Sequence, residues 1–180
     1  MGWFPAHVKR LDFIYFDAGG GHRSAALALK AVAEQQQRPW QVRLVNLQEV
    51  LDPLDVFRKV TGVRLQDLYN QLLKKGFTIG TGPLLRVMQL IVKVYHGSQV
   101  KLLSEFWRDS RPDMLVSLVP NFNRALFEGL RSADRAARAP DTPMVTILTD
   151  MADYPPHFWI EKQPQFLICG TSHAAEQAKG

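Results

Sequence analysis

Five short runs of Val, Ile, Leu and Phe alternate along the chain with longer segments of helical pattern. The helical segment 23–37 follows the first of these runs after a short turn. Buried strands of a parallel sheet are nearly continuous in apolar residues, because helices cover both faces. The predicted strands are residues 11–17, 40–47, 113–119, 144–150 and 165–170. This alternation predicts an α/β protein with a Rossmann-like, doubly wound and mainly parallel sheet.

A long segment of helical pattern, about residues 53–110, separates the second and third predicted strands. It is too long for one crossover connection, so we expect a helical insertion of several helices. Within it, residues 84–95 are densely apolar and carry Arg86 and Lys93, with His96 directly after. The run is shorter than the roughly 20 residues that span a bilayer. It can be a buried core helix, or an interfacial helix whose basic residues lie near lipid headgroups.

The overall composition is that of one globular domain covering residues 1–180, with 46% hydrophobic residues and a net charge of +5. The positive charge favours anionic partners, although charge alone does not choose among phosphates, nucleic acid and lipid headgroups. The basic stretch 131–138 is interpreted as a solvated helix face. The lone Cys169 can form no internal disulfide, and residues 1–12 lack the apolar core of a secretion signal. These features predict a cytoplasmic location.

A glycine-rich turn joins the first predicted strand to the first predicted helix. It consists of Gly19, Gly20, Gly21, His22, Arg23 and Ser24. Such a turn places the unpaired N–H groups and the positive end of a helix at the carboxyl edge of the sheet. Glycine also lets an anionic group approach the backbone closely. The turn is therefore predicted to hold an anion or a substrate.

The spacing of this turn does not match the two common phosphate fingerprints. A Walker loop needs Gly-Lys-Ser/Thr after four intervening residues, and the dinucleotide pattern needs a glycine where this chain has Ser24. His22 at the helix start can act as a general base, since the positive helix end disfavours the imidazolium and leaves a neutral ring. The alternative is that His22 only caps or packs against the helix.

Other ligand classes have weaker signals in the sequence. The five histidines are scattered and show no close pairing of the kind found in structural zinc sites, so no metal site is predicted. No interleaving of basic and aromatic residues indicates nucleic-acid binding. The segment 57–77 mixes basic and apolar residues and, with the apolar run after it, is a candidate for docking on an anionic membrane. An ordinary amphipathic helix packed on the sheet explains 57–77 equally well.

Two motifs together resemble a known family. The sequence "GGGHRSAALAL" after an apolar strand is similar to the N-terminal signature of the monogalactosyldiacylglycerol synthases and processive diacylglycerol glucosyltransferases. The sequence "VTILTDMADYPPHFW", residues 145–159, is similar to that family's strand ending in Thr-Asp, with His and Trp after a short loop. These enzymes are two-domain GT-B glycosyltransferases. The resemblance extends over about residues 11–170, with its specific content confined to the two motifs.

The resemblance implies roles for individual residues. His22 would be the base, or part of the relay, that deprotonates the diacylglycerol hydroxyl as it attacks the sugar. The three glycines, with Arg23 and Ser24, would form the acceptor side of the substrate cleft. Asp150 and His157 would line the same cleft, and Asp150 could orient His22 if the two strand ends are neighbours. The alternative for Asp150 is a turn or helix cap, and Trp159 is interpreted as a packing residue.

The family's donor-binding C-terminal domain has no counterpart in residues 1–180. We therefore expect an acceptor-side domain that is incomplete and inactive as a transferase by itself, with a nucleotide sugar as donor and no further cofactor. The implied partners are diacylglycerol or a related lipid, the nucleotide sugar and an anionic membrane surface, and nucleic acid is not expected. Two other hypotheses remain open: a non-catalytic lipid- or anion-binding module with the same fold, and an unrelated enzyme that binds a nucleotide phosphate at the glycine turn.

Overall fold

A computed structural model describes residues 8–17, 20–54, 90, 93–149, 160–161 and 163–179 of the chain. Its strands pair in parallel in the order β2-β1-β3-β4-β5. The strands are β1 (Lys9–Tyr15), β2 (Trp40–Asn46), β3 (Met114–Ser117), β4 (Met144–Ile147) and β5 (Phe166–Ile168). The helices are α1 (Gly21–Gln35), α2 (Leu47–Leu51), the 3₁₀ turn η1 (Asp52–Leu54), α6 (His96–Arg108), α7 (Asn123–Ala136) and α8 (Ser172–Lys179).

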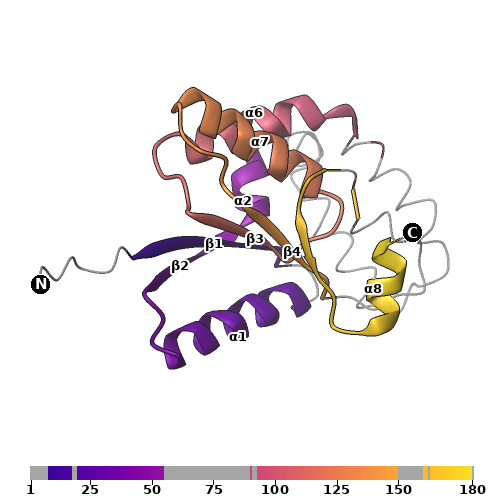
Figure 1. The fold of residues 1–180 in the computed structure, drawn as a ribbon. Helices are drawn as coiled ribbons and strands as arrows, with labels where there is room; N and C mark the ends of the chain where they lie inside the picture. Colours follow the sequence, from indigo (N-terminus) through magenta and orange to yellow (C-terminus); the bar gives the residue numbers. More distant parts are fainter. Residues whose placement is uncertain are drawn as a thin grey trace, which may run out of the picture.

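The helices lie on both faces of this sheet, as Figure 1 shows. Helix α1 covers one face, and α2, α6 and α7 lie across the other. The five strands occur where the apolar runs predict them, although β3, β4 and β5 are shorter than expected. The predicted Rossmann-like, doubly wound α/β fold is therefore confirmed. Of the predicted insertion 53–110, only its two ends fall within the described residues.

The strand order reverses between β1 and β3, which pair directly with each other. From β1 the chain crosses to β2 at one edge of the sheet, and from β3 it crosses to β4 and β5 at the other. In doubly wound sheets, ligands bind outside the carboxyl ends of the strands at this reversal. The turns after β1, β3 and β4 all lie at that edge.

The larger part of the core lies between the sheet and helices α6 and α7. Ile14 of β1, Trp107 of α6 and Leu126 of α7 are fully buried there. The two helices approach closely at Gly129, where a Cβ atom would come within 2.6 Å of the Cβ atom of Leu103. Close packing at this point requires glycine, although glycine lowers helix propensity.

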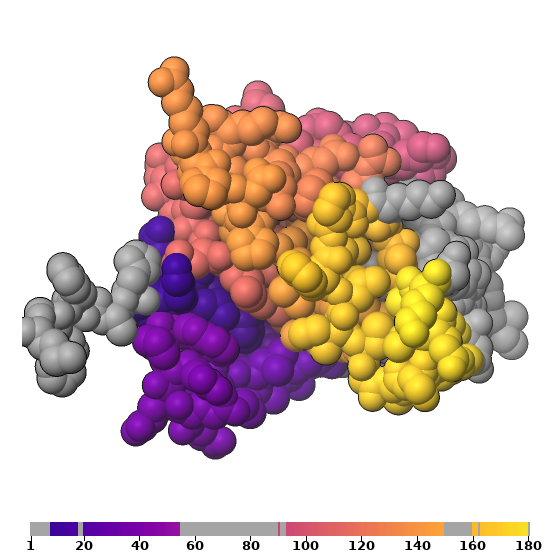
Figure 2. Space-filling model, viewed as in Figure 1, coloured from indigo at the N-terminus to yellow at the C-terminus, as the bar shows by residue number. Residues whose placement is uncertain are grey.

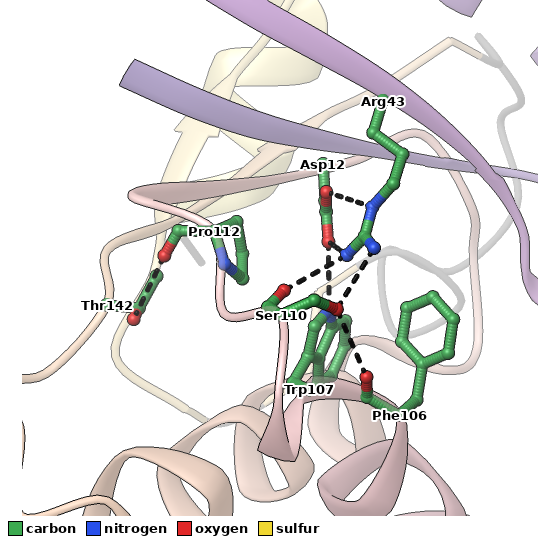
Figure 3. Close-up of polar contacts among 7 residues, drawn as sticks. All are labelled: Asp12, Arg43, Phe106, Trp107, Ser110, Pro112 and Thr142. Carbon is green, nitrogen blue, oxygen red and sulfur yellow. Dashed lines mark hydrogen bonds and ion pairs between the residues drawn. The ribbon is translucent and has the colours of Figure 1, made fainter. Parts of the chain in front are cut away.

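A partly buried polar cluster ties β1, β2 and α6 together on the same face (Figure 3). Arg43 Nε donates to Asp12 Oδ1 at 2.8 Å, and the indole Nε1 of Trp107 donates to Asp12 Oδ2 at 2.9 Å. The guanidinium of Arg43 also donates to Ser110 Oγ. Asp12 is almost fully buried and lies mid-strand, and Ser110 precedes β3. The cluster therefore joins the middle of β1 and β2 to the last turn of α6 and to Ser110 ahead of β3, and it stabilises the packing of α6.

Two expectations about exposure are wrong. The predicted strand 165–170 is not covered on both faces, because Phe166 and Ile168 of β5, which point to the same face, are 69% and 50% exposed. Figure 2 shows the C-terminal segment that contains β5 at the surface of the molecule. The basic stretch 131–138 is only partly a solvated face. Its last four residues are exposed, whereas Asp134 is fully buried, accepts from Thr142 N at 2.8 Å and pairs with Arg131. Sequence alone did not reveal that the α7–β4 connection folds over these side chains.

Candidate functional site

The fold brings the ends of the two motifs together at the carboxyl edge of the sheet. His22, in the first turn of α1, has its ring Nδ1 3.0 Å from the hydroxyl Oγ1 of Thr149, which follows β4. Strand β3 lies between β1 and β4, so His22 reaches across one strand to make this contact. Both side chains are partly buried. This contact is the centre of the candidate site.

The hydrogen bond constrains how His22 could act as a base. A neutral imidazole carries one proton, on Nδ1 or on Nε2, and only the other nitrogen can accept a proton. If Nδ1–H donates to Thr149 Oγ1, the lone pair that accepts a proton is on Nε2. Thr149 can thus select the tautomer in which Nε2 is the basic nitrogen.

The glycine turn uses its glycines for two different reasons. Gly20 precedes α1 in a left-handed conformation, with φ of 80°, so any side chain there would be strained. Gly21 has no such φ, and a Cβ atom added to it would meet nothing within 4 Å in the part of the chain that the structure describes. Gly20 is therefore required by the backbone, whereas Gly21 leaves open space in front of the helix N-terminus. The N-cap position of α1 is Gly20, which has no side chain to cap the helix. The first turn of α1 also contains no acidic residue.

The other described members of the turn are solvent-exposed. Arg23 Nη1 lies 3.3 Å from Asp17 Oδ2, which forms an exposed ion pair across the turn from the end of β1. Ser24 is exposed and its backbone N–H donates to Gly20 O within the first helical turn. Asp17 was not among the predicted site residues, although its position at the end of the first apolar run is visible in the sequence. Arg23 is thus available at the surface only in competition with Asp17.

Three of the predicted site residues lie outside the described residues: Gly19, Asp150 and His157. The contact between His22 and Thr149 brings the position before Asp150 to the glycine turn. The roles predicted for Asp150 and His157 stay predictions. Trp159 and the segment 57–77 also lie outside the described residues.

The connection from β3 to α7 completes this edge of the sheet and was not singled out by the sequence analysis. Phe122 packs edge-to-face on Phe16 of the β1–α1 connection, with ring centroids 5.3 Å apart. Asn121 adopts a left-handed conformation with φ of 66°. Asparagine is one of the few residues that tolerate this conformation. The Pro-Asn pair after a strand was the available turn signal.

A charged cluster lies at the N-termini of α6 and α7. Glu128 accepts from Arg124 Nε at 2.8 Å and lies 2.8 Å from His96 Nε2. The hydrogen bond from Arg124, helped by His96, lowers the pKa of Glu128. Glu161 accepts from the backbone N–H of Arg124 at 2.9 Å, and its burial raises its pKa above the ordinary value. Two carboxyl groups that share Arg124 are therefore shifted in opposite directions.

Neither a metal centre nor a membrane span is found in the part of the chain that the structure describes. No three His, Cys, Asp or Glu residues gather there in a way that could hold a metal ion. No helix there is long and apolar enough to cross a bilayer.

Comparisons with known proteins give no relative from which a function could be transferred. No family model matches the chain, and neither the curated proteins nor the solved structures give a match. The features that bear on function are therefore the two motifs and the contact between His22 and Thr149 that joins them.

Proposed function

We propose that this chain is the acceptor-side, N-terminal domain of a glycosyltransferase that moves a sugar from a nucleotide sugar to diacylglycerol or a related lipid. The observation that carries the proposal is the 3.0 Å contact between His22 and Thr149. The two residues belong to two separate motifs, each similar to the same family, and 127 positions separate them. Their meeting at the ligand-binding edge of a doubly wound sheet is what a shared site requires.

The chemistry assigned to the turn is proton transfer. The lipid hydroxyl oxygen forms a bond to the anomeric carbon of the sugar, and its proton passes to His22 Nε2. The bond between the anomeric carbon and the phosphate oxygen breaks, so the nucleoside diphosphate leaves with the bonding electrons. General base catalysis of this kind contributes roughly 10²- to 10⁴-fold in rate.

A lipid acceptor requires the domain to reach the bilayer surface, and one described feature supports this. Leu90 and Val94, four positions apart in the sequence ahead of α6, are 61% and 70% exposed, and the exposed Lys93 precedes Val94. Large exposed apolar side chains next to a basic residue are typical of interfacial helices. This favours the interfacial interpretation for the end of the run 84–95.

The deciding experiment is transfer of radiolabelled sugar from UDP-galactose, UDP-glucose and UDP-N-acetylglucosamine to diacylglycerol in mixed micelles. It compares the full reading frame, residues 1–180 alone, and the full reading frame with His22→Ala. A matched control is His173→Ala, which removes a histidine from the exposed start of α8. We expect activity in the full reading frame and in His173→Ala, and none in residues 1–180.

We expect His22→Ala to lower turnover by about 10² or more while the protein stays folded. Wild-type turnover in His22→Ala would refute the assignment of the base. Failure of the full reading frame with all three donors, combined with binding of diacylglycerol vesicles, would favour the non-catalytic module. Tight binding of free nucleotide by residues 1–180 would favour the nucleotide-dependent enzyme.

A further inference from the structure

The amino ends of β1 and β2 carry exposed apolar and basic residues side by side. Lys9 of β1 pairs with Trp40 of β2, and the backbone N–H of Lys9 donates to Pro39 O at 2.9 Å. This pairing brings the two neighbours of Lys9 in the chain next to the turn that leads into β2. We call the exposed residues of these two segments the rim patch: Val8, Arg10, Arg38, Pro39 and Trp40.

The apolar residues of the rim patch are open to solvent. Val8 is 53% exposed, and Trp40, which pairs with the next residue of β1, is 44% exposed. Single exposed apolar side chains are common on protein surfaces, whereas neighbouring ones beside charged residues are typical of interaction surfaces. A half-exposed tryptophan offers a large apolar area that a partner can bury.

The two arginines of the rim patch have no acidic partner in the part of the chain that the structure describes. Arg38 Nε donates to the amide oxygen of Gln36 at 3.2 Å. Asp113, the acidic residue that contacts this end of β1, accepts from Lys9 Nζ at 3.3 Å and from the backbone N–H of Arg10 at 2.8 Å. The side chains of Arg10 and Arg38 therefore present two positive charges that an anionic partner can pair with.

The rim patch lies at the amino edge of the sheet, away from the candidate site. Strand β1 has seven residues, so its ends are about 20 Å apart at roughly 3.3 Å per residue. Figure 1 shows the amino ends of β1 and β2 on the opposite side of the sheet from the first turn of α1, which carries His22. A partner on the rim patch therefore leaves the carboxyl edge open to substrate.

We propose that the rim patch binds an acidic segment of a soluble protein, whose carboxylates pair with the two arginines and whose apolar side chains cover Trp40. Tryptophan and arginine are enriched in the residues that carry most of the binding energy of protein–protein interfaces. The positive charge of the patch is complementary to carboxylates, which favours rapid and selective association.

Two other anionic partners fit the rim patch less well. Single-stranded nucleic acid is bound by stacking bases on open aromatic rings, but the guanidinium of Arg38 lies over the ring of Trp40, 5.8 Å from its centroid. A membrane would have to lie at the edge opposite the proposed lipid site. The choice of a soluble partner over a membrane therefore rests on the proposed function.

The test titrates ¹⁵N-labelled residues 1–180 with a synthetic glutamate-rich peptide that contains leucines. NMR follows the backbone amides and the indole N–H of Trp40. We expect shifts concentrated in residues 8–10 and 38–41, and weaker binding as the ionic strength rises. No shift at these residues, or shifts spread evenly over the surface, would refute the proposal.

Substitutions separate the rim patch from the general positive charge of the protein. Arg10→Gln with Arg38→Gln removes two charges from the patch, and the control Lys101→Gln with Lys179→Gln removes two from exposed positions on α6 and α8. We expect the arginine substitutions to weaken peptide binding about tenfold and the control about twofold or less. Equal weakening in both variants would show unspecific attraction and overturn the proposal.

A second variant tests the apolar part of the rim patch and keeps the proposal falsifiable if the arginine variant unfolds. Trp40→Ala should weaken binding of the leucine-containing peptide about tenfold, and should affect a peptide with glutamine in place of leucine much less. Equal loss with both peptides would contradict the apolar contact.

Vesicles of phosphatidylcholine and phosphatidylglycerol and a single-stranded oligothymidylate are titrated in parallel. If either binds more tightly than the peptide, and loses that affinity in the arginine variant, the patch serves a membrane or a nucleic acid and the proposal fails. No readout here is transferase activity, so the rim patch and the proposed function can fail separately.

Discussion

The ring of His22 lies 3.0 Å from the hydroxyl of Thr149, although 127 positions separate the two residues in the sequence. One belongs to the first turn of α1 and the other follows β4, and both stand at the carboxyl edge of the parallel sheet. A single hydrogen bond thus joins the two motifs on which the functional proposal depends.

Removing the hydroxyl of Thr149 is expected to remove the preference of His22 for the tautomer that is protonated on Nδ1. Thr149→Val keeps the size of the side chain and loses the partner of Nδ1, whereas Thr149→Ser keeps the hydroxyl. We expect Thr149→Val to change the ring ¹⁵N shifts of His22 and to lower transferase activity about tenfold, the effect of one lost hydrogen bond. Thr149→Ser should resemble the wild type in both. Identical ¹⁵N shifts in the valine variant would contradict the tautomer argument.

Gly20 and Gly21 are expected to respond differently to alanine. Gly20→Ala forces a side chain into a left-handed conformation and should lower the free energy of unfolding by roughly 1–2 kcal/mol. Gly21→Ala adds a methyl group in open space and should leave that free energy unchanged or raise it by less than about 1 kcal/mol. Urea denaturation measures both.

A ligand that approaches the backbone at Gly21 would make Gly21→Ala lose activity without losing stability. This combination separates a substrate contact from a folding defect. Full activity in a stably folded Gly21→Ala would show that no substrate comes close to this position.

Membrane docking through Leu90, Lys93 and Val94 predicts a dependence on both apolar surface and charge. Leu90→Ser with Val94→Ser should reduce flotation with vesicles of phosphatidylcholine and phosphatidylglycerol. Lys93→Gln should weaken binding about fivefold, corresponding to about 1 kcal/mol for one basic residue near an anionic surface. The control, Leu27→Ser with Val32→Ser, removes two exposed apolar side chains of α1. Vesicle binding that does not depend on phosphatidylglycerol would refute the docking proposal.

Glu128 and Glu161 are expected to titrate on opposite sides of the ordinary glutamate pKa of 4.5. The Arg124 hydrogen bond lowers the pKa of Glu128, so its contribution to stability is present above the unfolded pKa and is lost as pH falls through the folded value. Burial raises the pKa of Glu161, so its contribution is present below the unfolded pKa and is lost as pH rises through the folded value. Carboxyl ¹³C NMR titration measures both, and shifts on the same side would contradict this account.

The contact of α6 with α7 predicts contrasting effects at two helical glycines. Gly129→Ala should lower the free energy of unfolding by about 1–3 kcal/mol, because the new Cβ atom would meet Leu103 Cβ at 2.6 Å. Gly97→Ala, in the first turn of α6, meets nothing within 4 Å and should be neutral or slightly stabilising. A destabilised Gly97→Ala with an unaffected Gly129→Ala would show that the helices pack differently.

The sequence by itself determined the fold class and the place of the glycine turn. Continuous apolar runs such as 11–17 predict buried parallel strands because both faces of β1 are covered, and glycines followed by His22 predict a helix N-terminus at the carboxyl edge. These are local properties: period, propensity and the conformational freedom of glycine. The sequence wrongly predicted that both faces of β5 are covered, because a short run of apolar residues does not show how much of a strand the rest of the fold covers.

Only the tertiary structure decided which residues meet. The strand order brings Thr149 to His22, the approach of two helices explains Gly129, and the chain before β5 brings Glu161 to the N-terminus of α7. Each of these contacts joins positions far apart in the sequence, and no local pattern encodes the pairing of distant segments. The sheet order, which packing of the whole chain selects, sets these partners.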